Sequence, residues 1–243
     1  MDNRRTRRKR VRRFIAYSLV ILTAIICVLV AWGVYQFQHD PAYWTANEKF
    51  LKENTSEEIE GLANEAHNII SNALSTIMIQ PNGQRIIASE KSPIEKTINL
   101  STNQINAWLD RHFERWASNQ NIQLPSEISN IMIHPENGRV AMAFRYSKGE
   151  IQKVISLVFD ISMVGDGKAM FHLTQLRTGS LPLKPSWLSN NINDTKLKSL
   201  TNEMVKGKVV DMTFKHPVSK DHKITVQRLG IHGNGVVADL LTK

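Results

Sequence analysis

The sequence predicts an α+β protein: one N-terminal transmembrane helix, then a single domain in which a curled antiparallel sheet packs on two or three helices. Three observations predict this class. A run of 21 residues without a charged side chain, 14–34, follows a strongly basic N-terminus. Beyond it, apolar residues first recur every three or four positions, which is typical of helices. From residue 128 they recur mainly at every second position, which is typical of strands.

The uncharged run has the length of a membrane span. At about 1.5 Å per residue, Phe14 to Val34 would extend roughly 31 Å as a helix, close to the thickness of a bilayer core. Trp32 and Tyr35 are aromatic residues of the kind that mark a membrane interface. Cations precede the run at Arg4, Arg5, Arg7, Arg8, Lys9, Arg10, Arg12 and Arg13.

Two other kinds of N-terminal signal fit the run less well than an anchor does. A cleaved signal peptide has an apolar core of about 7–15 residues and a small-x-small cleavage site, and the residues after this run do not form such a site. A lipoprotein would need a small residue before Cys27, where Ile25 and Ile26 stand. The run is therefore interpreted as an uncleaved single-pass anchor.

Charge predicts the topology. Residues 1–13 hold eight of the 31 cations and one of the 22 anions, a net charge of +7, which leaves 23 cations and 21 anions, or +2, for the rest. Because basic residues beside a span stay inside, 1–13 is expected to be a cytoplasmic stub, 14–36 the anchor in the cell membrane, and 40–243 an extracytoplasmic domain. A nearly neutral outer domain gives no reason to expect a nucleic-acid partner.

Local signals place the helices. Asp40 and Pro41 are interpreted as the N-cap and first residue of a short helix that runs to about residue 53. Thr55 and Glu58 have the spacing of a capping box before an amphipathic helix over 56–75. Two more helices are expected over 103–117 and 195–206.

Alternation and turn residues place the strands. Segments 128–134, 139–146, 151–164 and 168–177 are expected to form an antiparallel meander, with Asn137-Gly138 as its first hairpin turn. Segments 208–214, 223–231 and 236–241 are expected as further strands, and short strands are expected at 84–88 and 96–100. Strands as long as those of the meander usually belong to a strongly twisted sheet.

The residues nominate no catalytic or metal site, and no cofactor is expected. No nucleophile elbow or phosphate loop is present, and Cys27, the only cysteine, lies in the span. No two histidines have the i, i+4 spacing of a helical metal site. Asp110 and Glu114 could form an acid pair, but ordinary surface ion pairs with Arg111 and Arg115 are the simpler interpretation. We expect no enzyme activity.

One apolar strand face is the candidate ligand site. A curled sheet wrapped round helices can leave an apolar groove, and the large side chains that would line it are Met142, Phe144, Phe159, Met163 and Phe171. The alternative is that these side chains belong to the ordinary core, as most apolar strand faces do.

Two segments resemble a known family. One is the strand and helix start Ile98 to Leu109, with Asn-Ala-Trp-Leu at its end; the other runs from Ile155 through a Gly-Asp-Gly turn to Leu-Arg-Thr-Gly-Ser-Leu-Pro-Leu183. Together, over roughly 96–187, they resemble the YpmS-like family of membrane-anchored proteins of bacterial envelopes. The resemblance implies an N-terminal span and an extracytoplasmic α+β domain, and it carries no catalytic residues over.

Three functions follow as hypotheses. The first is an envelope binding or scaffold module that accommodates a lipid or another apolar ligand. The second is an accessory subunit of a membrane complex, bound to another envelope protein and without a ligand of its own. The third, a hydrolase, predicts a cleft with converging titratable groups of perturbed pKa, for which the sequence nominates no residues.

Overall fold

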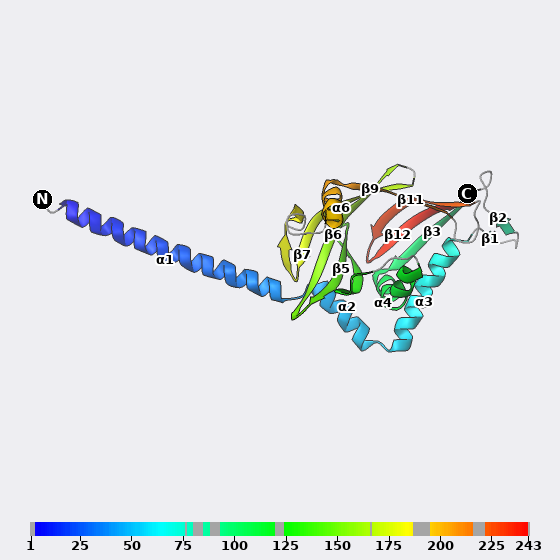
Figure 1. Ribbon diagram of the computed structural model, residues 1–243, viewed down its shortest axis with the longest axis horizontal. Helices are drawn as coiled ribbons and strands as arrows, with labels where there is room; N and C mark the ends of the chain where they lie inside the picture. Colours follow the sequence, from blue (N-terminus) through cyan, green and yellow to red (C-terminus); the bar gives the residue numbers. More distant parts are fainter. Residues whose placement is uncertain are drawn as a thin grey trace.

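The computed structural model describes residues 3–75, 77–79, 85–87, 93–119, 124–165, 167–186, 195–215 and 222–242. The expected class is confirmed: one long N-terminal helix leads into a domain of antiparallel sheets and helices. The sheets do not close into a barrel. In Figure 1 the helix projects from the domain as a straight rod. Residues 84 and 88, the ends of one short strand expected from the sequence, lie outside the described residues.

The helix α1 (Asn3–Gln38) holds the apolar run. Its stretch from Ile21 onward is long and apolar enough to cross a membrane, and it is not buried by the rest of the chain. Such an N-terminal helix is typical of a membrane anchor or a signal sequence. The expected basic residues, from Arg4 to Arg13, lie in its first turns.

Three helices follow on one side of the domain. These are α2 (Ala42–Glu53), α3 (Ser56–Ala73) and α4 (Thr102–Asn119). The capping box of α3 is confirmed: Glu58 N–H donates to Thr55 Oγ1 over 3.2 Å, and Thr55 N–H donates to the Glu58 carboxylate over 2.7 Å. The prediction that Asp40 caps α2 was wrong, because Pro41 takes the N-cap and Asp40 pairs with Arg145 instead.

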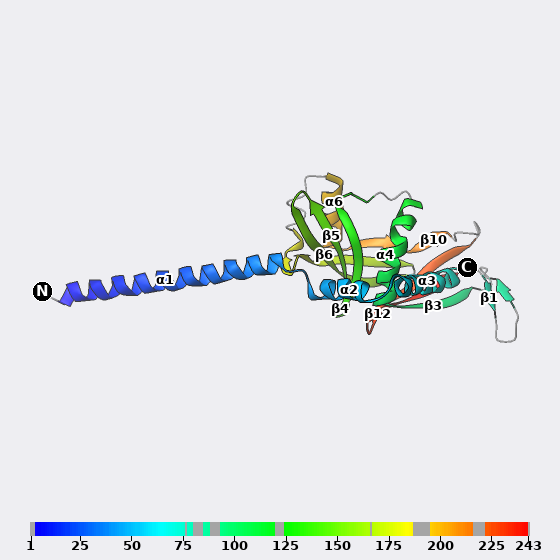
Figure 2. The same ribbon diagram turned by 90° about the horizontal axis from the view of Figure 1, so that it is seen from below.

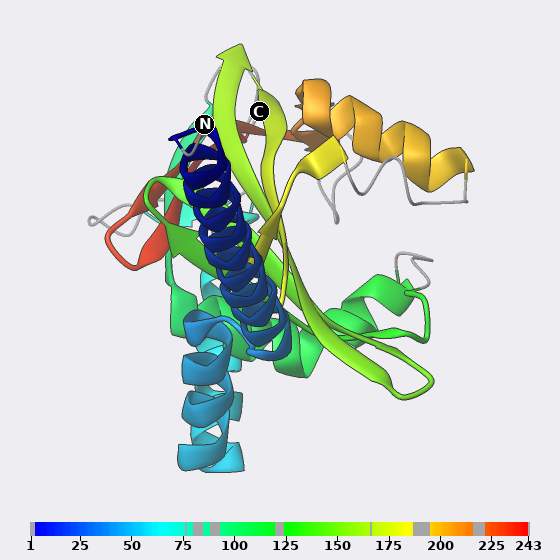
Figure 3. The same cartoon turned by 90° about the vertical axis from the view of Figure 1, so that its left-hand side faces the viewer.

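The expected meander is present in a larger sheet. Strands β4 (Ile128–Glu136), β5 (Arg139–Lys148), β6 (Ile151–Gly165), β7 (Lys168–Thr178) and β8 (Leu181–Leu183) pair in sequence order, and β9 (Lys208–Asp211) also pairs with β7. Viewed along α1, α2 and α6 (Thr195–Lys206) lie on opposite sides of these strands (Figure 3). The side of the sheet that α2 covers buries Trp44 against Met132, Ala143 and Val154.

The remaining strands form a second sheet, in the order β10 (Thr213–Lys215), β11 (Lys223–His232), β12 (Gly235–Thr242) and β3 (Ile94–Ser101). The strand expected over 208–214 is divided at Met212, whose N–H donates to Gly167 O while its own carbonyl accepts from Val226 N–H. The chain therefore passes from one sheet to the other at this residue. Strands β1 (Ile77–Ile79) and β2 (Arg85–Ile87) make a separate hairpin.

Asn106 of α4 joins three elements (Figure 2 shows α4 beside α2 and β4). Its side chain is 3% exposed, donates to Asn47 of α2 over 3.2 Å and accepts the Ile133 N–H of β4 over 2.8 Å. Strand β4 is an edge strand, and the Ile133 N–H points away from its neighbour β5. The next residue whose backbone nitrogen lies on this outer side is Pro135, which has no N–H. The edge is thus blocked where α4 crosses it.

We expect Asn106→Ala to destabilise the domain, because it leaves the Ile133 N–H without its acceptor. The loss should be about 2 kcal/mol, a fall in Tm of roughly 4–8 °C, measured by thermal unfolding of the full chain in detergent. Asn103→Ala, at an exposed position of the same helix, is the matched control. Equal Tm values for the two variants would contradict this role.

Candidate functional site

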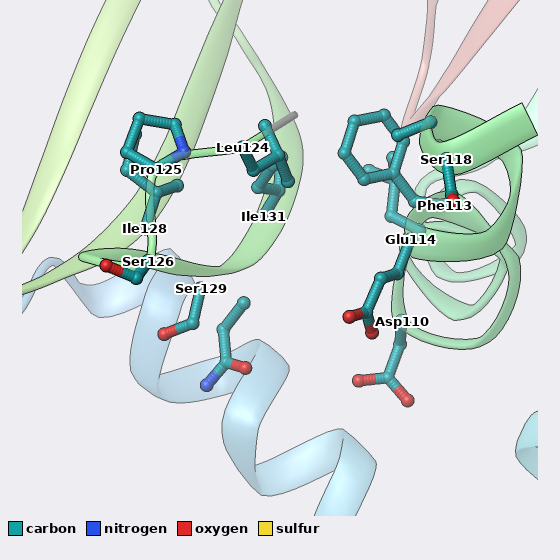
Figure 4. Close-up of a pocket in the computed structure, with 13 residues that line it drawn as sticks. Asp110, Phe113, Glu114, Ser118, Leu124, Pro125, Ser126, Ile128, Ser129 and Ile131 are labelled. Carbon is teal, nitrogen blue, oxygen red and sulfur yellow. The ribbon is translucent and has the colours of Figure 1, made fainter. Parts of the chain in front are cut away.

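An open groove lies between α4 and the start of β4 (Figure 4). It has a volume of about 790 Å³, within the usual range of ligand sites. Its apolar lining comes from both walls, with Leu109, Phe113 and Ala117 on α4 and Leu124, Pro125, Ile128 and Ile131 on or before β4. The remaining lining residues are polar, and the two acidic ones, Asp110 and Glu114, form a rim along α4.

The helical wall follows from the period of α4. Leu109, Phe113 and Ala117 are four residues apart and share one face, and Asp110 and Glu114 stand one position further round the helix. Their carboxylates lie along the α4 wall of the groove (Figure 4). The Phe113 ring packs 5.7 Å from the ring of Trp116, which is 43% exposed, so the apolar surface continues along the helix.

The strand wall is formed by an irregularity in β4. The register of β4 on β5 shifts between Ser129 and Met132, and Asn130 has a φ of 51°. Such a bulge bends the strand and changes the direction of nearby side chains. Met132 is buried under α2, and Ile131, one residue earlier, lines the groove, as the alternation of side chains along a strand gives.

The groove carries an uneven charge. The carboxylate of Asp110 lies 3.3 Å from Arg111, an ion pair that was expected from the sequence. Among the described residues no ion pair is present for Glu114, although Arg115 follows it directly. Glu114 therefore makes the rim better suited to a cationic group than to a phosphate or carboxylate.

The apolar face predicted from the sequence lies elsewhere. In the meander Met142 pairs with Leu157 and Phe144 with Ile155, on the side of the sheet away from α2. Met142 is 38% exposed, Phe159 is buried, and Phe144, Met163 and Phe171 are half-buried. The face is real, but none of its five residues lines the groove.

A second cluster of polar side chains lies under α2. Tyr43 donates to Ser156 over 2.5 Å and stacks on the His134 ring with 4.7 Å between centroids. Arg177 donates two hydrogen bonds of 2.7 and 2.8 Å to the carboxylate of Glu136. These are the converging titratable groups that the hydrolase hypothesis requires, and the sequence did not indicate them because they come from three separate segments.

The pKa values in this cluster are set by burial and by the ion pair. Hydrogen bonds from Arg177 hold the pKa of the Glu136 carboxyl below its ordinary value. Burial raises the pKa of the Tyr43 hydroxyl and lowers the pKa of the His134 imidazole. The Glu136 carboxylate is thus ion-paired with Arg177, and Ser156 is fully buried. None of the four titratable residues, Tyr43, His134, Glu136 and Arg177, lines the groove. The cluster fastens α2 to the sheet.

A third feature connects α1 to the domain. The Ser180 N–H lies 2.9 Å from the Gln36 carbonyl and 2.8 Å from the His39 carbonyl, and it donates to both. Gly179 has a φ of +56°, and a Cβ there would lie 2.7 Å from the carbonyl oxygen of Phe37. Only glycine fits this turn, which belongs to the Thr-Gly-Ser-Leu-Pro segment that carries the family resemblance.

Among the described residues, no group of three or more His, Cys, Asp or Glu side chains is placed to hold a metal ion. Cys27 lies in α1 with its side chain exposed. A scan against protein-family models and searches of curated proteins and of solved structures found no match to the chain. The resemblance to the YpmS-like family therefore stays a prediction.

The His134 pKa predicts a loss of stability at mildly acidic pH. Because its pKa is below the ordinary 6.5 in the folded state, the unfolded chain binds the proton more readily, so stability is complete above pH 6.5 and falls as the pH drops below it. The free energy of unfolding, measured with urea between pH 8 and pH 5, should show this fall. In the His134→Gln variant the fall between the two pH values should be smaller. Glu136 contributes a separate loss only below its ordinary pKa of 4.5.

The matched control is His172→Gln, at an exposed position of β7. This variant should keep the pH dependence of the parent chain, because its imidazole is not placed in the cluster. A pH dependence that His134→Gln leaves unchanged would contradict the assignment to His134.

Proposed function

We propose that this protein is a single-pass membrane protein with an extracytoplasmic binding module, and that the groove between α4 and β4 binds an apolar segment of another envelope protein. The observation that supports the proposal is the groove itself: a space of ligand-site size lined by apolar side chains from both walls, with the Glu114 carboxylate, which has no ion pair among the described residues, on one wall. The bound segment would carry large apolar side chains and a flanking Lys or Arg.

The anchor is the first part of the proposal. The length and composition of α1 suit a span, and the eight cations before it favour a cytoplasmic N-terminus. The hydrogen bonds from Ser180 to the end of α1 support a permanent anchor over a cleaved signal, because the folded domain uses the helix end as part of its own structure.

The charge of the rim favours a protein segment over an anionic lipid. Glu114 would repel a phosphate headgroup and attract a Lys or Arg side chain, whereas the Asp110 carboxylate is already paired with Arg111. A lipid remains the second candidate on one observation, the partly exposed apolar face around Met142 on the other side of the sheet from α2. We place the hydrolase hypothesis last, since the titratable cluster lies apart from the groove.

Topology can be tested with single cysteines in a Cys27→Ser background. A membrane-impermeant maleimide added to intact cells should label Val209→Cys, whose position is 51% exposed on β9, and should label Asn3→Cys only after the cells are permeabilised. The protein should stay in the membrane fraction at alkaline pH. Labelling of Asn3→Cys in intact cells would reverse the proposed orientation.

The groove can be tested by photo-crosslinking in the native membrane. A benzophenone side chain at Ile128 should form an adduct with a protein, and the same group at Val209 should not. Glu114→Lys should lower the adduct yield by up to about fivefold. An exposed ion pair between Glu114 and a cation of the partner contributes up to about 1 kcal/mol, which corresponds to this factor in affinity. Glu60→Lys, at an exposed acid of α3, should leave the adduct yield unchanged.

The mass of the adduct decides between the candidates. A protein adduct that depends on Glu114 supports the proposal. A lipid adduct at Ile128, or a protein adduct that Glu114→Lys and Glu60→Lys reduce equally, would overturn it.

A further inference from the structure

The end of the domain nearest α1 presents the tip of the β5–β6 hairpin. In Figures 1 and 2 this tip lies level with the end of α1, at the edge of the domain that faces along the helix. The tip consists of Lys148, Gly149, Glu150 and Ile151, all exposed. Ile151 is 59% exposed, more than most large apolar side chains outside α1.

The position of the tip relative to α1 is fixed by direct contacts. Two residues from Ile151 along β6, the Lys153 ammonium lies 4.5 Å from the centroid of the Phe37 ring at the end of α1. One residue further, the Val154 carbonyl accepts from Gly179 N–H, in the turn that binds the α1 carbonyls. Ile151 thus lies two residues, roughly 7 Å along the strand, from the residue of β6 whose side chain contacts the end of the helix.

The surroundings have the composition of a membrane interface. Tyr35 and Phe37 are exposed aromatic residues at the end of α1, and Lys148 and Lys153 outnumber the single acid Glu150 at the tip. Aromatic and basic side chains gather where a protein meets lipid headgroups, with the ammonium groups placed towards the phosphates.

We propose that the β5–β6 tip is a second membrane contact, in which Ile151 enters the lipid interface on the side where α1 leaves the bilayer. The partner is the lipid bilayer that holds α1, and the contact rests on the proposed anchoring. A helix alone leaves its domain free to tilt and rotate at the surface. A second contact beside the helix removes that freedom and fixes the distance between the groove and the membrane surface.

The test measures the membrane depth of single spin labels by electron paramagnetic resonance, with the full chain in bilayers that contain anionic lipid. Labels are placed at Glu150→Cys, which keeps Ile151, and at Ile151→Cys, both in a Cys27→Ser background. The native Cys27 is the positive control for the span. Val209→Cys is the negative control, because β9 pairs with β7 near Met170, about eight residues or roughly 26 Å of strand from the α1 contact.

The proposal expects labels at 150 and 151 to collide more often with oxygen dissolved in the lipid, and less often with a water-soluble nickel complex, than the label at 209. Labels at 150 and 151 as accessible to the nickel complex as the label at 209 would overturn the second contact while a lipid-buried Cys27 upheld the anchor. A water-accessible Cys27 would overturn the anchor, and the hairpin contact with it.

Discussion

The position of the whole domain depends on one backbone interaction, the donation of the Ser180 N–H to the carbonyls of Gln36 and His39. The last carbonyls of a helix have no partner within it, and a helix that leaves an apolar environment must find partners nearby. The turn at Gly179 supplies them, because the absence of a side chain lets the two backbones approach. The direction of α1 is thereby fixed against β6, β7 and β8, which together carry the rest of the sheet.

A second constraint separates a closed part of the sheet edge from an open one. Asn106 accepts the Ile133 N–H, and Pro135 has none to offer, so this part of β4 cannot pair with another strand. The bulge at Asn130 then turns the start of β4 away from the closed edge and leaves space against α4. The groove therefore lies beside the open part of the edge, next to the part that this packing protects.

The sequence predicted what local patterns determine. The capping box at Thr55 and the Asn137-Gly138 turn depend on neighbouring residues, and both are confirmed. The alternation expected along the long strands holds only in part, because the register shifts in β4 after Ser129 and between β6 and β7 at Val158. The division at Met212 and the α1 contact of Ser180 depend on residues far along the chain, which no local pattern reports. Alternation placed Met142 and Phe144 together on one face but could not say which face α2 would cover, and α2 covers the one with Ala141 and Ala143. The groove was missed because Asp110 and Glu114 have the pattern of any solvated helix face.

The location of the groove bears on the partner it would meet. Its strand wall begins where β4 joins the end of β5, since the Ser147 N–H donates to the Glu127 carbonyl and Ile128 pairs with Tyr146. That end of β5 leads directly to the hairpin tip beside α1.

A segment with apolar and basic side chains concentrates at an anionic membrane surface, and the attraction of the surface fades within about 8–10 Å at physiological ionic strength. An acidic groove held at this height would compete with lipid for such a segment where it is most concentrated. An anionic ligand would be drawn neither to the surface nor to the rim. The charges of the groove and the contact of the domain with α1 therefore favour the same class of partner, a basic and apolar stretch of another membrane protein.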